Sequence, residues 1–293
     1  MIIMKASAFA PGHISAFFEP IYQNQNAARS GSRGAGINIS LGATSQVVVD
    51  SSVNQTIDIF LNNKKADALV SKLAIKHLIG DTLLHITINT KLHLPTGQGF
   101  GMSGAGALSS TIALAKLLHI PNEDALKASH YAEVELHTGL GDILASSFGG
   151  IEIRREAGLP PWGMIEHIPG KFEITVCIIG SEIDTKKILT DPEKIKNIAS
   201  YGRYCTKKIL EKPSIENLFS LAQTFTKKIG LADKKVLEAI DAANQYGMAS
   251  MCMLGNSVFA IGDTDALCKT LTNFGRVYVC LVDEYGARII TSN

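Results

Sequence analysis

Alternation of apolar and polar residues is clearest between residues 85 and 94. A period of two is typical of a strand with one buried face, so this segment is predicted as a strand. Runs of similar character at 45–50 and 56–61 predict two more strands. The apolar positions on the buried face of the 85–94 segment are Ile86, Ile88, Leu92 and Leu94.

Helical periodicity replaces this alternation immediately downstream. Between 103 and 118 apolar residues recur every three or four positions, which predicts a helix. The Pro-Asn pair at 121–122 ends that helix and caps a second one, expected over about 123–137. Glycines within 138–141 provide a helix stop, and a short alternating strand is expected at 151–155.

The second half of the chain begins with a buried strand and continues with helices. We expect a strand at 172–179, helices between 192 and 247, hairpin strands at 250–254 and 257–261 around a two-residue Gly255-Asn256 turn, a helix at 265–273 and a strand at 276–282. This order is typical of an α+β fold. We therefore expect two domains, residues 1–170 and 171–293, connected near the Pro-Pro-Trp-Gly segment at 160–163.

Composition limits the classes of function. The chain has 293 residues, of which 19% are charged and 46% hydrophobic, so it has the apolar content of a folded protein. Its 28 basic and 27 acidic residues give a net charge of +1, which predicts no general attraction to nucleic acid or to anionic membranes. A small-molecule substrate is the better expectation.

Five cysteines are spread along the chain without a Cys-x-x-Cys pair, so neither a disulfide framework nor a zinc site is indicated. A reducing compartment, the cytoplasm, is expected. No apolar run approaches the ~18 residues of a membrane span. The start, Met1 to Lys5, has its charge after a very short apolar stretch, which is opposite to the order in a signal peptide.

The segment from Pro95 to Gly106 is the most informative for chemistry. Its closely spaced glycines allow backbone N–H groups to converge on an anion, and the helix that follows adds the positive end of its dipole. The spacing matches neither a P-loop nor a dinucleotide fingerprint, and the alternative is a flexible surface turn. The candidate nucleotide-binding residues are Pro95, Gly97, Gly99, Gly101, Ser103, Gly104, Ala105 and Gly106.

Two carboxylates follow this loop. Glu133 lies late in the second predicted helix, and Asp142 follows a glycine-bracketed turn. The two side chains can converge on one cleft, where one would hold Mg²⁺ and the other would take a proton. The alternative for an isolated Glu on a helix is a solvated face.

The order of these motifs resembles the GHMP kinases of small metabolites. The family's central Pro-x-x-x-Gly-Leu-Gly-Ser-Ser-Ala motif is similar to residues 95–105, although Phe100, Met102 and Gly104 depart from it. An early Ala-Pro-Gly-His-Ile sequence at 10–14 and the Gly-Gly pair at 149–150 are also similar. The late glycine motif is represented only weakly, by residues 254–257.

This resemblance implies a two-domain α+β fold, with an N-terminal domain like the second domain of ribosomal protein S5 and a ferredoxin-like C-terminal domain. It also implies ATP and Mg²⁺ as cofactors, with Ser103 and Glu133 as metal ligands and Asp142 as the catalytic proton acceptor. Because the Glu-to-Asp spacing is shorter than in the mevalonate kinase branch, Glu135 is a rival to Glu133 as the metal ligand. A homodimer is a further expectation from the family.

Within the family, segments 11–15, 31–36 and 137–142 are most similar to the archaeal-type pantoate kinases of coenzyme A biosynthesis. Pantoate would then be the substrate. Two alternatives stay open, namely another kinase of the family, of shikimate or homoserine type, and a nucleotide-binding module without catalysis.

Four basic residues are candidates for binding the substrate: His13, Arg33, His130 and Arg155. Arg33 lies in a glycine-rich segment predicted as a turn, and Arg155 is expected on the face of Ile151 and Ile153, pointing inward. A planar guanidinium suits a substrate carboxylate. The alternatives are an exposed charge for Arg33, a structural ion pair for Arg155 and structural roles for the two histidines.

Overall fold

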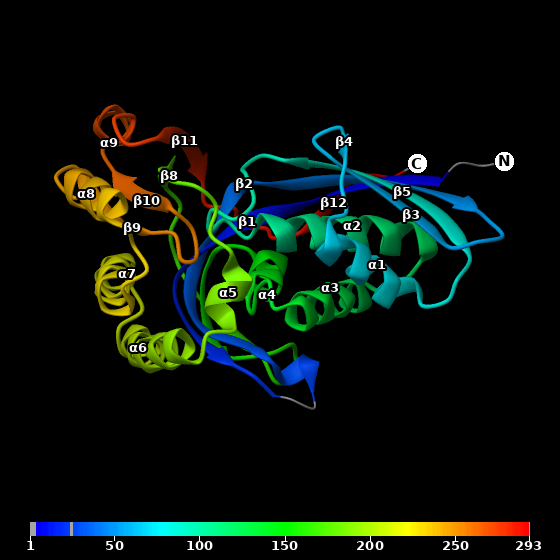
Figure 1. Cartoon of the computed structure of the whole chain (residues 1–293), viewed down its shortest axis with the longest axis horizontal. Helices are drawn as coiled ribbons and strands as arrows, with labels where there is room; N and C mark the ends of the chain where they lie inside the picture. Colours follow the sequence, from blue (N-terminus) through cyan, green and yellow to red (C-terminus); the bar gives the residue numbers. More distant parts are fainter. Residues whose placement is uncertain (1–3, 24–25, 293) are drawn as a thin grey trace.

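A computed structural model describes residues 4–23 and 26–292. The first three residues of the segment considered above for a signal peptide lie outside the described residues. The described chain forms two sheets, each with helices packed against it, and the strands β1 and β2 extend along the boundary between them (Figure 1). In this part of the chain no helix is long and apolar enough to cross a membrane.

The larger sheet has eight strands among the described residues, in the order β12-β1-β2-β5-β3-β4, with β6 pairing with β2 and β7 with β6. All pairs are antiparallel except β3 with β5. The strands are β1 (Met4–Ile21), β2 (Gly31–Ser51), β3 (Thr56–Leu61), β4 (Lys64–Lys65), β5 (Leu84–Leu92), β6 (Ile151–Glu156), β7 (Met164–Ile168) and β12 (Arg288–Ser292).

Helices α1 to α4 lie together on one side of this sheet (Figure 1). Helix α2 packs against β1 and β2 on one side and against α1 and α3 on the other, so nearly all of its residues are buried. The hydroxyl groups of its buried Ser109, Ser110 and Thr111 are satisfied internally, as when Ser109 Oγ meets Ser45 Oγ at 2.7 Å. The elements are the 3-10 turn η1 (Ala27–Arg29), α1 (Leu69–Ile79), α2 (Met102–Leu118), α3 (Asn122–Leu136) and α4 (Asp142–Phe148).

The smaller sheet has the order β11-β8-β10-β9 and is antiparallel throughout. Numbered within the domain this is the 4-1-3-2 order of a ferredoxin-like fold, so the predicted two-domain α+β fold is confirmed. Its elements are β8 (Glu173–Ile178), α5 (Thr185–Leu189), α6 (Pro192–Glu211), α7 (Ile215–Ile229), α8 (Lys234–Ala243), β9 (Gly247–Met251), β10 (Ser257–Gly262), α9 (Thr264–Leu271) and β11 (Arg276–Leu281).

Several predictions about local structure were wrong. The 31–36 segment is the beginning of β2 and not a turn, and its glycines serve close packing, since a Cβ on Gly36 would lie 2.5 Å from Nε2 of His13. The β9–β10 connection spans residues 252–256 and is longer than a two-residue turn. Strand β1 was missed because most of it is buried on both faces, so its sequence does not alternate.

Helix α6 of the second half of the chain packs against β1 of the larger sheet. A Cβ on Gly202 of α6 would lie 2.0 Å from the carbonyl oxygen of Phe18, and Arg203 Nε donates to Glu19 Oε1 at 2.8 Å, so α6 lies directly on this strand. Strand β12 returns from the second sheet to pair with β1. We propose 1–170 and 171–293 as the two domains, with this last strand completing the first sheet.

Candidate active site

The glycine-rich loop predicted between a strand and a helix connects β5 to α2. Gly97, Gly99 and Gly101 have φ angles of +69°, +75° and +60°, a region that side chains disfavour. The first N–H groups of a helix have no intrahelical partner. At α2 the cap residue is Gly101, which has no side chain to accept from them, so they stay available to a ligand. Ser103 in the first turn of α2 is exposed and faces the cleft described below. This arrangement suits an anion.

The loop is packed tightly, unlike a flexible turn. Gln98 Nε2 donates to the carbonyl of Gly180 at 3.0 Å, and Ser257 Oγ donates to the carbonyl of Gln98 at 2.5 Å. A Cβ on Gly255 would lie 2.0 Å from the carbonyl carbon of Gln98. The weakly matching 254–257 segment therefore supports the loop from the second domain.

A cleft that is partly open to solvent lies beside this loop. Binding sites for small molecules are typically concave surfaces of this kind, with a few polar groups that converge on the ligand. The predicted residues that line it are Gly97, Gly99, Gly101, Ser103, Gly104, Glu133 and Asp142. Residues that the sequence analysis did not name as site residues also line it, among them Ser15, Phe18, Ser32, Thr138, Leu140, Thr185 and Leu189.

Glu133 is nearly completely buried at the wall of the cleft. A Cβ on Gly139 would lie 2.3 Å from its Oε1, and a Cβ on Gly104 would lie 2.9 Å away, so both glycines make room for this carboxyl group. Its Oε2 has no hydrogen-bond partner among the described residues. Burial, and secondly the charge of Asp142, raise the pKa of Glu133 well above its ordinary value.

The rival residue Glu135 lies elsewhere. Its side chain is 60% exposed and meets His77 Nε2 at 3.1 Å, away from the cleft. Of the two candidates, Glu133 is therefore the one in position to act on a ligand in the cleft.

Asp142 is the first residue of α4, and its Oδ1 lies 2.6 Å from Nδ1 of His13. Burial raises the pKa of Asp142, but the hydrogen bond and charge of His13, together with the charge of Arg154, outweigh burial and lower it below its ordinary value. Asp142 therefore loses its proton more readily than an ordinary aspartate, and Glu133 holds its proton more tightly than an ordinary glutamate. Opposite shifts in neighbouring acids are typical of sites that divide chemical roles.

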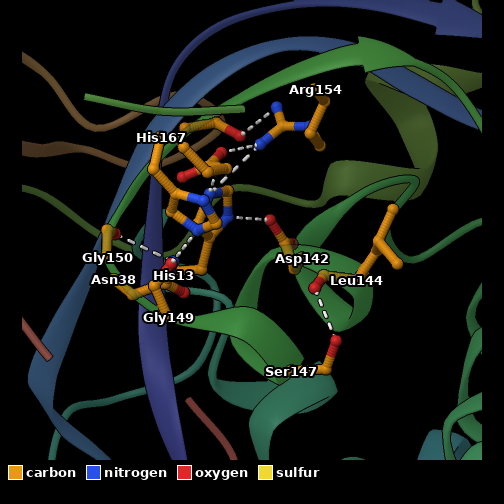
Figure 2. A network of polar contacts seen from close by, with 11 residues as sticks. His13, Asn38, Asp142, Leu144, Ser147, Gly149, Gly150, Arg154 and His167 are labelled. Carbon is orange, nitrogen blue, oxygen red and sulfur yellow. Dashed lines mark hydrogen bonds and ion pairs between the residues drawn. The ribbon is translucent and has the colours of Figure 1, made fainter. Parts of the chain in front are cut away.

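His13 connects Asp142 to further buried charges (Figure 2). Its Nε2 lies 3.0 Å from Glu152 Oε1, and the same oxygen accepts from Arg154 Nη1. Arg154 Nη2 continues to Ser15 Oγ at 3.3 Å. Burial lowers the pKa of His13, but the two carboxylates outweigh burial and raise it to about 9. The imidazole, a predicted substrate ligand, is completely buried behind the cleft wall.

Neither predicted arginine lines the cleft. The pairing of β6 with β7 is irregular between Arg154 and Glu156, which breaks the alternation expected from Ile151 and Ile153. Arg155 therefore points outward and binds Glu166 Oε1 at 2.6 Å. Arg33 Nε donates to the carbonyl of Arg155 at 2.8 Å.

A third arginine, Arg154, lies behind the cleft wall next to the lining residues Ser15 and Gly141, and the sequence analysis missed it. Its guanidinium is completely buried, and its Nε has no partner among the described residues. Two charged residues, Glu152 and Arg154, stand two positions apart in an apolar strand, so both share one face. That spacing is the signal that could have identified them.

The remaining predicted residues do not line the cleft. Nε2 of His130 lies 3.0 Å from the carbonyl oxygens of both Ala27 and Ser30, and burial lowers the pKa of this histidine, so it supports the η1 segment as a neutral ring. Ala105 and Gly106 are buried within α2, and Pro95 precedes the part of the loop that borders the cleft.

Comparison with known proteins places this geometry in context. Residues 67–150 match the GHMP kinases N terminal domain. The chain is 33% identical to the pantoate kinase of Methanocaldococcus jannaschii, covering 93% of this chain and 98% of that protein. It is 31% identical to the pantoate kinase of Methanospirillum hungatei, over 99% and 98% of the two chains.

Solved structures agree with these relatives. A phosphotransferase related to the CoA biosynthesis pathway superposes with a TM-score of 0.88 at 26% identity, over 99% of each chain. The homoserine kinase of Cytophaga hutchinsonii superposes with a TM-score of 0.70 at 17% identity, over 98% and 97% of the chains, which shows a shared fold.

Proposed function

The chain belongs to the GHMP kinase family, and from that premise we propose that it transfers the γ-phosphoryl group of ATP to the primary hydroxyl of pantoate, giving 4-phosphopantoate for coenzyme A biosynthesis. The observation that carries this proposal is the glycine loop at the start of α2, which borders the same cleft as Glu133 and Asp142. Relatives of similar length that are named pantoate kinases support the choice of substrate.

The loop and the first turn of α2 bind the phosphates of ATP. Their N–H groups neutralise the charge on the phosphoryl oxygens, which is the main way in which proteins accelerate this reaction. The tight packing of the loop fixes these donors before the substrate arrives, so little reorganisation is needed during transfer.

Mg²⁺ fits the wall formed by Ser103 and Glu133. Mg²⁺ prefers oxygen ligands, and the same cleft offers an exposed hydroxyl and a buried carboxyl oxygen that has no partner among the described residues. When bound, the ion neutralises charge on the phosphates of ATP. Glu133 must lose its proton to act as a ligand.

Asp142 accepts the proton of the attacking hydroxyl. Its carboxylate is ionised, is held by His13 and remains 26% exposed toward the cleft. As the hydroxyl oxygen bonds to the γ-phosphorus and the bond to the ADP oxygen breaks, the hydroxyl proton passes to Asp142.

The remainder of the cleft suits pantoate. Phe18, Leu140 and Leu189 provide apolar surface for its two methyl groups. Arg154 lies behind the lining residues Ser15 and Gly141, with its Nε 2.9 Å from where a Cβ on Gly141 would lie. We assign it, in place of Arg33 or Arg155, as the cation that attracts the substrate carboxylate.

A homodimer in the cytoplasm completes the proposal. All five cysteines are free, which suits a reducing compartment. Light scattering after gel filtration tests the dimer, which follows from the family resemblance.

The deciding experiment measures ADP formation with ATP, Mg²⁺ and a panel of hydroxy acids and alcohols, including pantoate, shikimate and homoserine. We expect pantoate to give the highest kcat/KM. If another acceptor gives a higher kcat/KM, that compound replaces pantoate as the proposed substrate. If no acceptor supports ADP formation, the chain is better described as a nucleotide-binding module.

A further inference from the structure

The ring of His13 lies between two carboxylates that belong to different elements. Nδ1 is 2.6 Å from Asp142 Oδ1 at the start of α4, and Nε2 is 3.0 Å from Glu152 Oε1 on β6. The side chains of His13 and Glu152 are completely buried. We propose that His13 is a positioning residue, which holds the proton acceptor Asp142 and the substrate-binding Arg154 in one rigid unit; this inference rests on the proposed function.

Hydrogen-bond chemistry determines the form of the ring. An ionised carboxylate only accepts hydrogen bonds, so a ring nitrogen that faces one carries a proton. Both ring nitrogens of His13 face carboxylates, and the ring is therefore an imidazolium. Arg154 Nη1 shares the same Glu152 oxygen, which explains why it lies only 3.2 Å from His13 Nε2. The charges alternate along the series Asp142, His13, Glu152 and Arg154.

Among the described residues, charged groups face the ring of His13 from three elements. Asp142 faces it from α4, Glu152 and Arg154 face it from β6, and the charge of His13 also reaches Glu133 on α3. Two carboxylates in direct contact outweigh the desolvation of the ring, in agreement with a pKa of about 9.

His13 also contacts the glycine loop. Its backbone N–H donates to the carbonyl of Phe100 at 2.9 Å, and a Cβ on Gly101 would lie 3.4 Å from both the Cβ of His13 and the Cβ of Asp142. His13 therefore contacts the glycine loop, Asp142 and the guanidinium of Arg154. Among the described residues, His13 supplies the only side-chain hydrogen bond to Asp142.

Two variants distinguish the contribution of the hydrogen bond at Nδ1 of His13 from that of the hydrogen bond at Nε2. The amide nitrogen of His13→Asn lies near the position of Nδ1 and can still donate to Asp142, whereas that of His13→Gln lies near Nε2 and can still donate to Glu152. We expect His13→Gln to lower kcat by about 10–100-fold, the effect of losing one charge-assisted hydrogen bond, with the KM for ATP unchanged. His13→Asn should retain a clearly higher kcat and show its loss in the KM for pantoate.

The control is His77→Asn, because His77 also meets a carboxylate, Glu135, but at the exposed surface. This variant should match the wild type in kcat, in KM for ATP and in KM for pantoate. A purely structural role for His13 would lower the unfolding temperature of both variants and leave their kcat values, per folded molecule, equal. That result would overturn the proposal.

A second measurement does not depend on activity or on the variants. ¹⁵N NMR of the wild-type histidines, with His13 assigned by comparison with whichever variant folds or by selective labelling, should show both ring nitrogens protonated at pH 7. A ring that carries no proton on Nδ1 could not donate to Asp142, and that result would also overturn the proposal. If the wild type forms no ADP with pantoate, the proposed function fails, while the NMR result still decides the state of His13.

Discussion

Glu133 and Asp142 line the same cleft, yet their pKa values are shifted in opposite directions. Burial raises the pKa of Glu133, whereas for Asp142 the contact with protonated His13 outweighs burial. The difference arises from their partners, since one carboxyl group has a cation at 2.6 Å and the other has an oxygen without a partner among the described residues.

Asp142→Asn should lower kcat by about 10²–10⁴-fold and leave the affinity for ATP near normal, because it removes the proton acceptor without changing its size. Steady-state kinetics and the binding of a non-hydrolysable ATP analogue measure the two effects. Near-wild-type turnover would show that Asp142 is not the proton acceptor.

Ser103→Ala and Glu133→Gln should each raise the Mg²⁺ concentration needed for half-maximal activity, because each removes an oxygen ligand. Glu135→Gln is the matched control, since this exposed carboxylate lies away from the cleft. Titration of activity with Mg²⁺ at saturating ATP is the measurement. If Glu135→Gln raised the requirement and Glu133→Gln did not, the assignment of the ligand would be reversed.

Gly139→Ala should resemble Glu133→Gln. A Cβ at this position would lie 2.3 Å from Glu133 Oε1, so the carboxyl group must move. We expect a higher Mg²⁺ requirement together with a loss of about 1–3 kcal/mol in stability from overpacking. A Mg²⁺ requirement identical to that of the wild type would indicate that the position of Glu133 is unimportant.

In the absence of Mg²⁺, Glu133→Gln should stabilise the protein at high pH. The folded pKa of Glu133 lies above its ordinary value of 4.5, so the stability associated with the protonated form is present below pH 4.5 and is lost as pH rises through the folded pKa. Glutamine stays neutral throughout. Thermal unfolding of both proteins in EDTA at pH 5 and pH 8 should show a larger advantage of the variant at pH 8, and a difference independent of pH would contradict the shift.

Arg154→Lys should weaken the use of pantoate and spare the KM for ATP. Lysine keeps the charge but loses the planar fork that meets both Glu152 and Ser15, and imperfect pairing with a buried carboxylate costs on the order of 2–5 kcal/mol. Arg155→Ala is the control, because this arginine binds the exposed Glu166. If Arg154→Lys and Arg155→Ala have equal kcat/KM for pantoate, Arg154 does not bind the substrate.

The sequence by itself determined the elements whose signals are local. The helix after the glycine loop was predicted within one residue of its start, and the strand at 56–61 matches β3, because periodicity and glycine spacing act over a few residues. The same local signals indicated Ser103, Glu133 and Asp142, all of which line the cleft.

Tertiary structure decided the rest. Glu133 and Glu135, two positions apart, lie on different faces of one helix, and the packing of α3 against Gly104 and Gly139 decides that Glu133 is the one at the cleft. Likewise, an irregularity in the pairing of β6 with β7 turns Arg155 outward, while Arg154 faces the interior. His13 and Asp142 are 129 residues apart, and β1 brings them into contact. Such relationships depend on which strands pair and in what register, which is decided by burial across the whole fold and not by neighbouring residues.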